Sequence, residues 1–123
     1  MSVSMSAYGS ALRVTVEFAG GIDAHVKPEC LQMVDGAKLA RIELPRRLDD
    51  SRAPTMRSLI AHVAQHCFAS GAELFSTDDE LRPGILAIIN DADWEITEDG
   101  VDKYDYVLQD QDAIVFVSTL HGG

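Results

Sequence analysis

The last two residues of the chain, Gly122 and Gly123, are the residues best suited to chemistry. Val117, the last β-branched residue of an apolar stretch, lies six positions before Gly123, so the chain would end as a short arm leaving a strand. A carboxylate must be activated before it reacts, for instance as an acyl-adenylate, and an enzyme that does so must close around it to exclude water. Glycines can thread a narrow channel because they lack Cβ atoms. The pattern predicts that the Gly123 carboxyl group reacts and that catalysis belongs to a partner. The alternative is a frayed tail or a cloning remnant.

Two histidines, His62 and His66, are four residues apart on a predicted helix, a spacing that can hold zinc. The metalloprotease pattern requires Glu directly after the first histidine, where this chain has Val63. We therefore favour two partly exposed histidines on the flank of a helix over a metal site.

Three acidic residues, Asp91, Asp93 and Glu95, alternate like the start of a calcium-binding loop. That loop requires Gly at its sixth position and Glu at its twelfth, and this chain has Ile96 and Asp102 there. The pattern favours a hairpin turn rich in Asp.

No other motif predicts catalysis. The segment Arg82-Pro83-Gly84 lacks the length and the lysine of a phosphate-binding loop. Cys30 and Cys67 are the only cysteines, which indicates free thiols in a reducing compartment, and Cys67 falls on the apolar face of the predicted helix, where a buried, inert thiol is expected. The chain is thus expected to be no enzyme and to bind no metal or cofactor of its own.

The composition indicates one domain with an acidic surface. The chain has 123 residues, 46% of them hydrophobic, and a net charge of −10. This charge disfavours direct nucleic-acid binding and favours a basic surface on a partner. No apolar run reaches the ~20 residues of a membrane span, and the first residues lack a signal-peptide pattern, so a cytoplasmic location is expected, with the nucleus as a second compartment.

The periodicity of the sequence predicts five strands and one helix. Thr55 is a suitable N-cap for the helix, Ser70-Gly71 is expected to end it, and its apolar residues recur at offsets that lie on one face. Residues 22–35 are expected to form a long connection and residues 72–82 an acidic loop. The strands are predicted at 12–18, 38–44, 85–89, 94–96 and 113–117, and the helix at 56–68.

This order predicts a two-layer α+β domain of the β-grasp type, with a mixed four- to five-stranded sheet packed on one main helix. The last strand is apolar on both faces, which favours a central position. The predicted division is a flexible N-terminal extension at 1–11, a β-grasp domain at 12–118 and a flexible Gly-Gly tail at 119–123.

Two long segments resemble the eukaryotic ubiquitin-related modifier family, the sulfur carriers among the ubiquitin-like proteins. They are LRPGILAIINDADWE at 81–95 and YVLQDQDAIVFVSTLHGG at 106–123. Weaker similarity to the same family extends over VTVEFAGG, MVDGAKLARIELP and the predicted helix. The segments 22–32 and 100–104 are longer than the family pattern, and 1–11 is additional to it.

The resemblance implies that an adenylating and rhodanese-like activating enzyme, using ATP and Mg, converts Gly123 to a thiocarboxylate. A tRNA thiolase complex would pass the sulfur to the tRNA wobble uridine, and the activated terminus would also be joined to lysines of target proteins. The enzyme would grip Thr119, Leu120, His121 and Gly122. Self-acceptor lysines are Lys27, Lys38 and Lys103. Alternatives are a plain β-grasp interaction module and the sulfur-donor subunit of a cofactor synthase.

Overall fold

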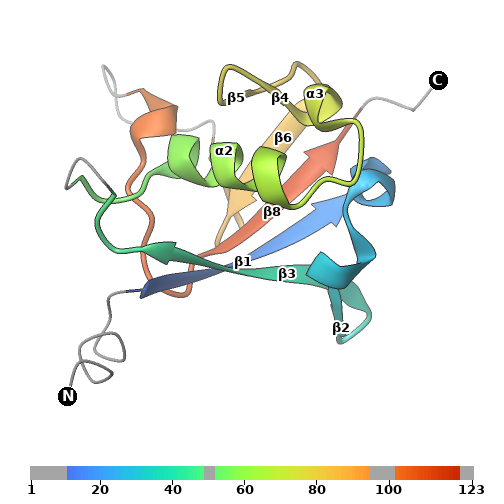
Figure 1. The fold of residues 1–123 in the computed structure, drawn as a ribbon, viewed down its shortest axis with the longest axis horizontal. Coiled ribbons are helices and arrows are strands. Elements are labelled where there is room, and N and C mark those ends of the chain that lie inside the picture. Colours follow the sequence, from blue (N-terminus) through green and yellow to red (C-terminus); the bar gives the residue numbers. More distant parts are fainter. Residues whose placement is uncertain (1–10, 49–51, 95–101, 120–123) are drawn as a thin grey trace.

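The computed structural model describes residues 11–48, 52–94 and 102–119 and shows a mixed sheet crossed on one face by a helix (Figure 1). The six-stranded sheet has the order β2-β3-β1-β8-β6-β7. The bounds of these strands are β1 Ala11–Ala19, β2 Gln32–Val34, β3 Ala37–Pro45, β6 Ile85–Ile89, β7 Ala92–Asp93 and β8 Ala113–Ser118.

The centre of the sheet is the parallel pair β1 and β8, in which Val16 lies opposite Ile114. Antiparallel neighbours flank this pair, with β3 beside β1 and β6 beside β8. The predicted central position of the last strand is therefore confirmed, and the first two predicted strands pair with each other in antiparallel orientation. The arrangement is the expected β-grasp fold.

The main helix, α2, runs over Met56–His66 and covers one face of the sheet (Figure 1). Thr55 caps it in a capping box with Ser58, in which each side chain accepts a hydrogen bond from the other residue's backbone N–H. The predicted apolar stripe is buried, with Met56, Leu59, Ile60 and Val63 fully covered. None of the described helices has the length and apolar character needed to cross a membrane.

The helix ends earlier than predicted, at His66 rather than near Gly71. The chain leaves the helix there because the backbone N–H of Lys27 donates to the carbonyl of Cys67 at 2.8 Å, and Val26 forms an isolated bridge with Phe68. Gly71, with φ 72°, instead precedes a second short helix.

Several short elements were missed by the sequence analysis. The predicted connection at 22–35 contains two 3-10 helices, η1 Ile22–His25 and η2 Pro28–Cys30, and strand β2. The predicted loop at 72–82 contains α3 Ala72–Phe75 and a small hairpin of β4 Ser76–Thr77 and β5 Glu80–Leu81. Strands of two or three residues are too short to show a period, so these predictions were wrong.

The predicted return strand is present but lies earlier than expected, as β7, which ends at Asp93. Trp94 is buried instead of continuing it, and Glu95 and Ile96 lie outside the described residues. β1 begins at Ala11, the last residue of the predicted N-terminal extension.

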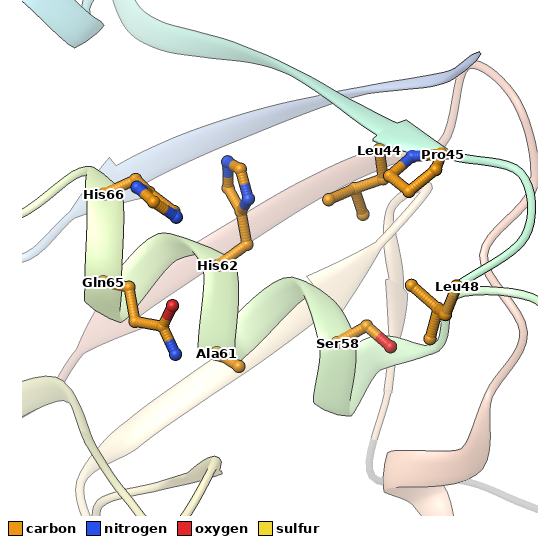
Figure 2. A pocket seen from close by; sticks show the side chains of 8 residues that line it. All are labelled: Leu44, Pro45, Leu48, Ser58, Ala61, His62, Gln65 and His66. Atoms are coloured by element: carbon orange, nitrogen blue, oxygen red, sulfur yellow. The ribbon is translucent and has the colours of Figure 1, made fainter. Parts of the chain in front are cut away.

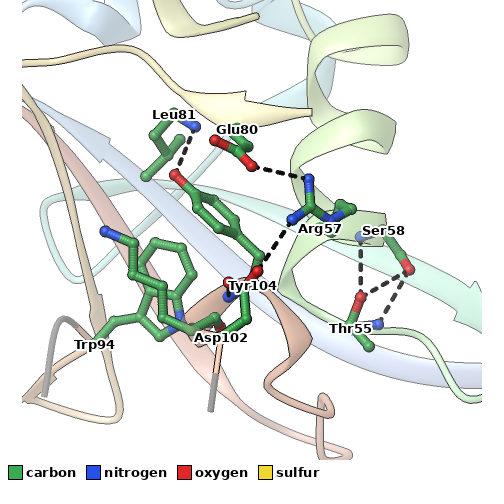
Figure 3. A network of polar contacts seen from close by, with 9 residues as sticks. Thr55, Arg57, Ser58, Glu80, Leu81, Trp94, Asp102 and Tyr104 are labelled. Carbon is green, nitrogen blue, oxygen red and sulfur yellow. Dashed lines mark hydrogen bonds and ion pairs between the residues drawn. The ribbon is translucent and has the colours of Figure 1, made fainter. Parts of the chain in front are cut away.

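A network around the buried side chain of Tyr104 joins a late loop to α2 (Figure 3). The third 3-10 helix, η3 Lys103–Asp105, carries it. The Leu81 backbone N–H donates to the Tyr104 hydroxyl at 3.1 Å, and the Arg57 guanidinium lies 5.0 Å from the centre of the ring. Arg57 also pairs with Glu80 and Asp102, so this loop, β5 and the start of α2 are held together.

Candidate functional site

The end of β8 is the root of the predicted reactive tail, and neighbouring backbone fixes it. Thr119 directly follows β8 and is exposed. Its backbone N–H and its Oγ1 both donate to the carbonyl of Gly84, at 2.7 Å and 2.9 Å. The chain is therefore held in place as far as Thr119.

A glycine on the other side of β8 allows β1 to approach its end closely. Gly20 has φ 78°, and a Cβ atom there would collide with the carbonyl oxygen of Ser118. Gly20 and Gly84 thus lie on either side of the strand end. The sequence analysis singled out neither glycine for this role, because such a close approach joins segments that are far apart in the sequence.

The start of β8 is fixed by the buried carboxylate of Asp112. It accepts hydrogen bonds from Asn90 Nδ2 at 2.8 Å and from the Tyr106 hydroxyl and the Gln109 backbone N–H, both at 2.9 Å. Burial, together with the hydrogen bond to Asp112, raises the pKa of Tyr106 to about 12. Asp112 was not singled out from the sequence.

The sheet face opposite α2 carries an apolar patch beside the tail root. The patch consists of Leu86, Ile88, Val115 and Val117: Leu86 lies opposite Val117 and Ile88 opposite Val115 across the β6–β8 pair. Leu86 is 47% exposed and the other three are half-buried. An exposed apolar patch of this kind is typical of an interaction surface.

Of the predicted tail, only Thr119 belongs to the described residues; Leu120, His121, Gly122 and Gly123 lie outside them. The structure thus brings the tail root and the apolar patch to the same end of β8. The reactive role of Gly123 stays a prediction.

The two helix histidines lie as the favoured interpretation requires. His62 is half-buried and His66 exposed, and their ring centres are 4.7 Å apart. Burial, and then the proximity of His66, lowers the pKa of His62. Within the described segments, no three His, Cys, Asp or Glu side chains gather in a way that could hold a metal.

The Asp-rich segment is a hairpin turn, as predicted. Asn90 and Asp91, with φ 52° and 68°, form a two-residue turn between β6 and β7. Asn and Asp tolerate these left-handed values better than most residues. Asp93 lies in β7, and Glu95 lies outside the described residues.

Both cysteines are free thiols, Cys30 half-buried and Cys67 buried as predicted. Burial, with a smaller effect of the neighbouring Cys30 thiol, raises the pKa of Cys67 to about 11. A thiol in this state is a poor nucleophile at neutral pH, which fits a structural role.

The three lysines differ in accessibility. Lys38 is exposed and pairs with Asp23 at 3.6 Å. Lys27 and Lys103 are half-buried. The ammonium group of Lys103 lies 5.0 Å from the ring centre of Trp94 and 5.4 Å from that of Tyr104. Lys38 is therefore the most accessible of the three lysines.

A helix-backed mixed sheet with a central C-terminal strand whose end lies at the surface defines a ubiquitin-like protein. The sequence model of the family described as Urm1 (Ubiquitin related modifier) matches residues 13–123, and the chain belongs to this family. By family, it is a modifier rather than an enzyme.

Known relatives cover nearly the whole chain. Ubiquitin-related modifier 1 of Aspergillus oryzae is 42% identical over 99% of this chain and 92% of its own. Ubiquitin-related modifier 1 of Homo sapiens is 40% identical over 91% of this chain and 96% of its own. The solution structure of Urm1 from Trypanosoma brucei superposes with a TM-score of 0.58 at 31% identity, covering 94% of this chain and 99% of that one.

Proposed function

We propose that this chain is a sulfur carrier and protein modifier whose reacting group is the carboxyl group of Gly123. Membership of the ubiquitin-related modifier family carries the proposal, and the placement of the tail root supports it. Thr119 is exposed at the end of a strand that neighbouring backbone holds on both sides. The globular body would serve as a handle that an enzyme grips while the tail enters its active site.

The chemistry proceeds in two steps on a partner enzyme. In the first, the Gly123 carboxylate attacks ATP with Mg bound at the enzyme, and pyrophosphate leaves, which gives an acyl-adenylate. In the second, an enzyme persulfide attacks the acyl carbon, AMP leaves, and reduction of the resulting acyl disulfide by a thiol gives the thiocarboxylate. That sulfur is used by a tRNA thiolase complex for 2-thiolation of the wobble uridine.

The activated terminus also has a second use. A lysine amine of a target protein attacks the same activated carbonyl, and an isopeptide bond forms in place of the bond to the leaving group. Thr119, Leu120, His121 and Gly122 form the segment that the activating enzyme grips, and the apolar patch around Leu86 is the surface on which its body docks. We place these reactions in the cytoplasm, with the nucleus as a further compartment.

The test is the intact mass of the protein after incubation with ATP, Mg, a sulfur donor and the cognate activating enzyme. We expect the gain that corresponds to the replacement of one oxygen by sulfur, located at the C-terminal residue. The matched control is the chain lacking Gly123, which should fold normally and show no gain. A wild-type chain that stays at its original mass would refute the proposal.

Two further measurements separate the alternatives. A plain interaction module, which the apolar patch would also suit, should restore tRNA thiolation in deficient cells even when a tag is fused behind Gly123. The sulfur-donor subunit of a cofactor synthase should instead co-purify in a stable complex with a synthase partner. If the chain is a carrier and modifier, the tagged chain should not restore tRNA thiolation, and the untagged chain should form no stable complex with a synthase.

A further inference from the structure

A groove of about 620 Å³ lies between α2 and the end of β3 (Figure 2). Leu44, Leu48 and Ala61 are among the apolar residues that line it, and His62 projects into it from the helix. β1 separates β3 from β8, so this groove is distinct from the apolar patch and the tail root.

The strand that borders this groove has a free edge. β2 pairs only with Ala37–Leu39 of β3, and no other strand in the described parts of the chain pairs along the rest of that side. On β1, the Arg13 carbonyl accepts a hydrogen bond from the Gln111 backbone N–H, and the Thr15 backbone N–H donates to the Asp112 carbonyl. These backbone groups of β1 therefore face the side of β8. Their partners on β3, Glu43 and Arg41, therefore direct their backbone N–H and C=O groups away from β1, towards the free side. Such unpaired groups are a template for another strand.

The same edge is basic, although the chain carries a net charge of −10. Four of the ten basic residues lie within residues 38–47, where Glu43 is the single acidic residue. All four are exposed: Lys38, Arg41, Arg46 and Arg47. Two copies of this edge would repel one another, whereas an acidic segment would be attracted.

We propose that β3 and the groove bind an extended acidic segment of a partner protein, which adds to the sheet as a further strand. Backbone hydrogen bonds to Arg41 and Glu43 supply the pairing. In an added strand, every second side chain faces the helix side, so alternate branched apolar residues enter the groove beside Leu44 and Ala61. Acidic residues at the ends of the segment meet Arg41 and Arg46. Because the groove is separate from the tail, the partner binds whether or not Gly123 is activated.

The probe is the synthetic peptide Asp-Glu-Val-Ile-Val-Ile-Asp-Glu, titrated into the full chain labelled with 15N. We expect amide shifts at Arg41, Glu43 and Ala61, with slowed hydrogen exchange at the first two. A control peptide with proline in place of the first isoleucine loses a backbone N–H and should bind at least about tenfold more weakly. Absence of shifts, or shifts confined to the apolar patch, would overturn the proposal.

A pair of matched variants tests the groove itself. Ala61→Glu introduces a carboxylate into the groove and should weaken peptide binding by about tenfold or more through like-charge repulsion. Ala69→Glu makes the same change at an exposed position beyond the end of α2, outside the groove, and should leave binding unchanged. Circular dichroism checks that both variants fold. If both variants bound the peptide equally weakly, binding would depend only on the net charge of the chain, and the groove would not be the binding site.

The alternative occupant of the β3 edge and the groove is a second copy of the chain. Analytical ultracentrifugation of the protein alone tests this alternative. We expect a monomer at the concentrations of the titration. A dimer that Ala61→Glu dissociates and Ala69→Glu does not would assign the edge to self-association and contradict an acidic partner segment.

Discussion

At the scale of single residues, the structure gives glycines and buried side chains roles that the sequence does not display. Gly20 and Gly36 both have positive φ, 78° and 84°, but only Gly20 lies against another strand. A Cβ atom at Gly20 would meet the Ser118 carbonyl, whereas one at Gly36 would meet open space. The first glycine therefore serves the strand end from which the tail leaves, and the second serves only its own turn.

We expect Gly20→Ala to lower the free energy of unfolding by about 2 kcal/mol or more, because backbone strain and a steric clash act together. Gly36→Ala, which adds strain without a clash, should cost about 1 kcal/mol. Urea denaturation of both variants measures the difference. Equal costs would show that β1 does not approach the end of β8 as closely as described.

Cys67 provides a pH-dependent prediction. Because its pKa is raised from 9.0 to about 11, the folded chain keeps this proton at pH values where the unfolded chain loses it. The stability from this shift is present below pH 9 and is lost as the pH rises towards 11. The difference in stability between wild type and Cys67→Ala should therefore shrink over that range.

A labelling experiment tests the burial of the same thiol. At pH 8, iodoacetamide should label Cys30 before Cys67 in the folded chain, and both at similar rates in urea. Simultaneous labelling of the two cysteines in the folded chain would contradict the burial of Cys67.

At the scale of elements, length decided what could be predicted from the sequence. β1, α2, β6 and β8 are long enough to show a period or a continuous apolar run, and each was located correctly to within a few residues. The short strands β2, β4, β5 and β7 exist because left-handed turn residues close them, and two to three residues carry no pattern of their own. The position where α2 ends depends on its contact with residues 26–27, which no local signal encodes.

The anchoring of β8 at its start gives a prediction at this scale. Asp112→Asn should lower the free energy of unfolding by about 2 kcal/mol, because an amide nitrogen would replace one of the acceptors for Asn90, Tyr106 and Gln109. Asp110→Asn is the matched control. That side chain is exposed and accepts a hydrogen bond from the Arg13 backbone N–H, so Asp110→Asn should lower the stability clearly less than Asp112→Asn does. Thermal or urea denaturation measures the difference. Similar losses of stability in the two variants would show that Asp112 does not anchor the start of β8.

At the scale of the whole molecule, the acidic charge, the terminal glycines and the central last strand were all readable from the sequence. The apolar patch was not, because it forms only when β6 and β8 pair and bring four apolar side chains together on the sheet face opposite α2. The sequence predicts a reactive group at the chain end, but only the folded sheet shows which surface lies beside the tail root.

That surface yields the last prediction. Leu86→Asp places a charge in the apolar patch. If the patch is the docking surface of the proposed activating enzyme, this change should raise the KM of that enzyme by about tenfold, since a hot-spot residue at the centre of an interface contributes about 1 kcal/mol or more. Leu74→Asp is the matched control, because Leu74 is similarly exposed, 53% against 47%, but lies on α3 away from the patch. Both variants should lose less than about 1 kcal/mol of stability, as surface changes usually do. The rate of pyrophosphate release at several protein concentrations gives KM and kcat. If Leu74→Asp raised the KM as well, or if Leu86→Asp left it unchanged, the enzyme would recognise the tail without docking on the apolar patch.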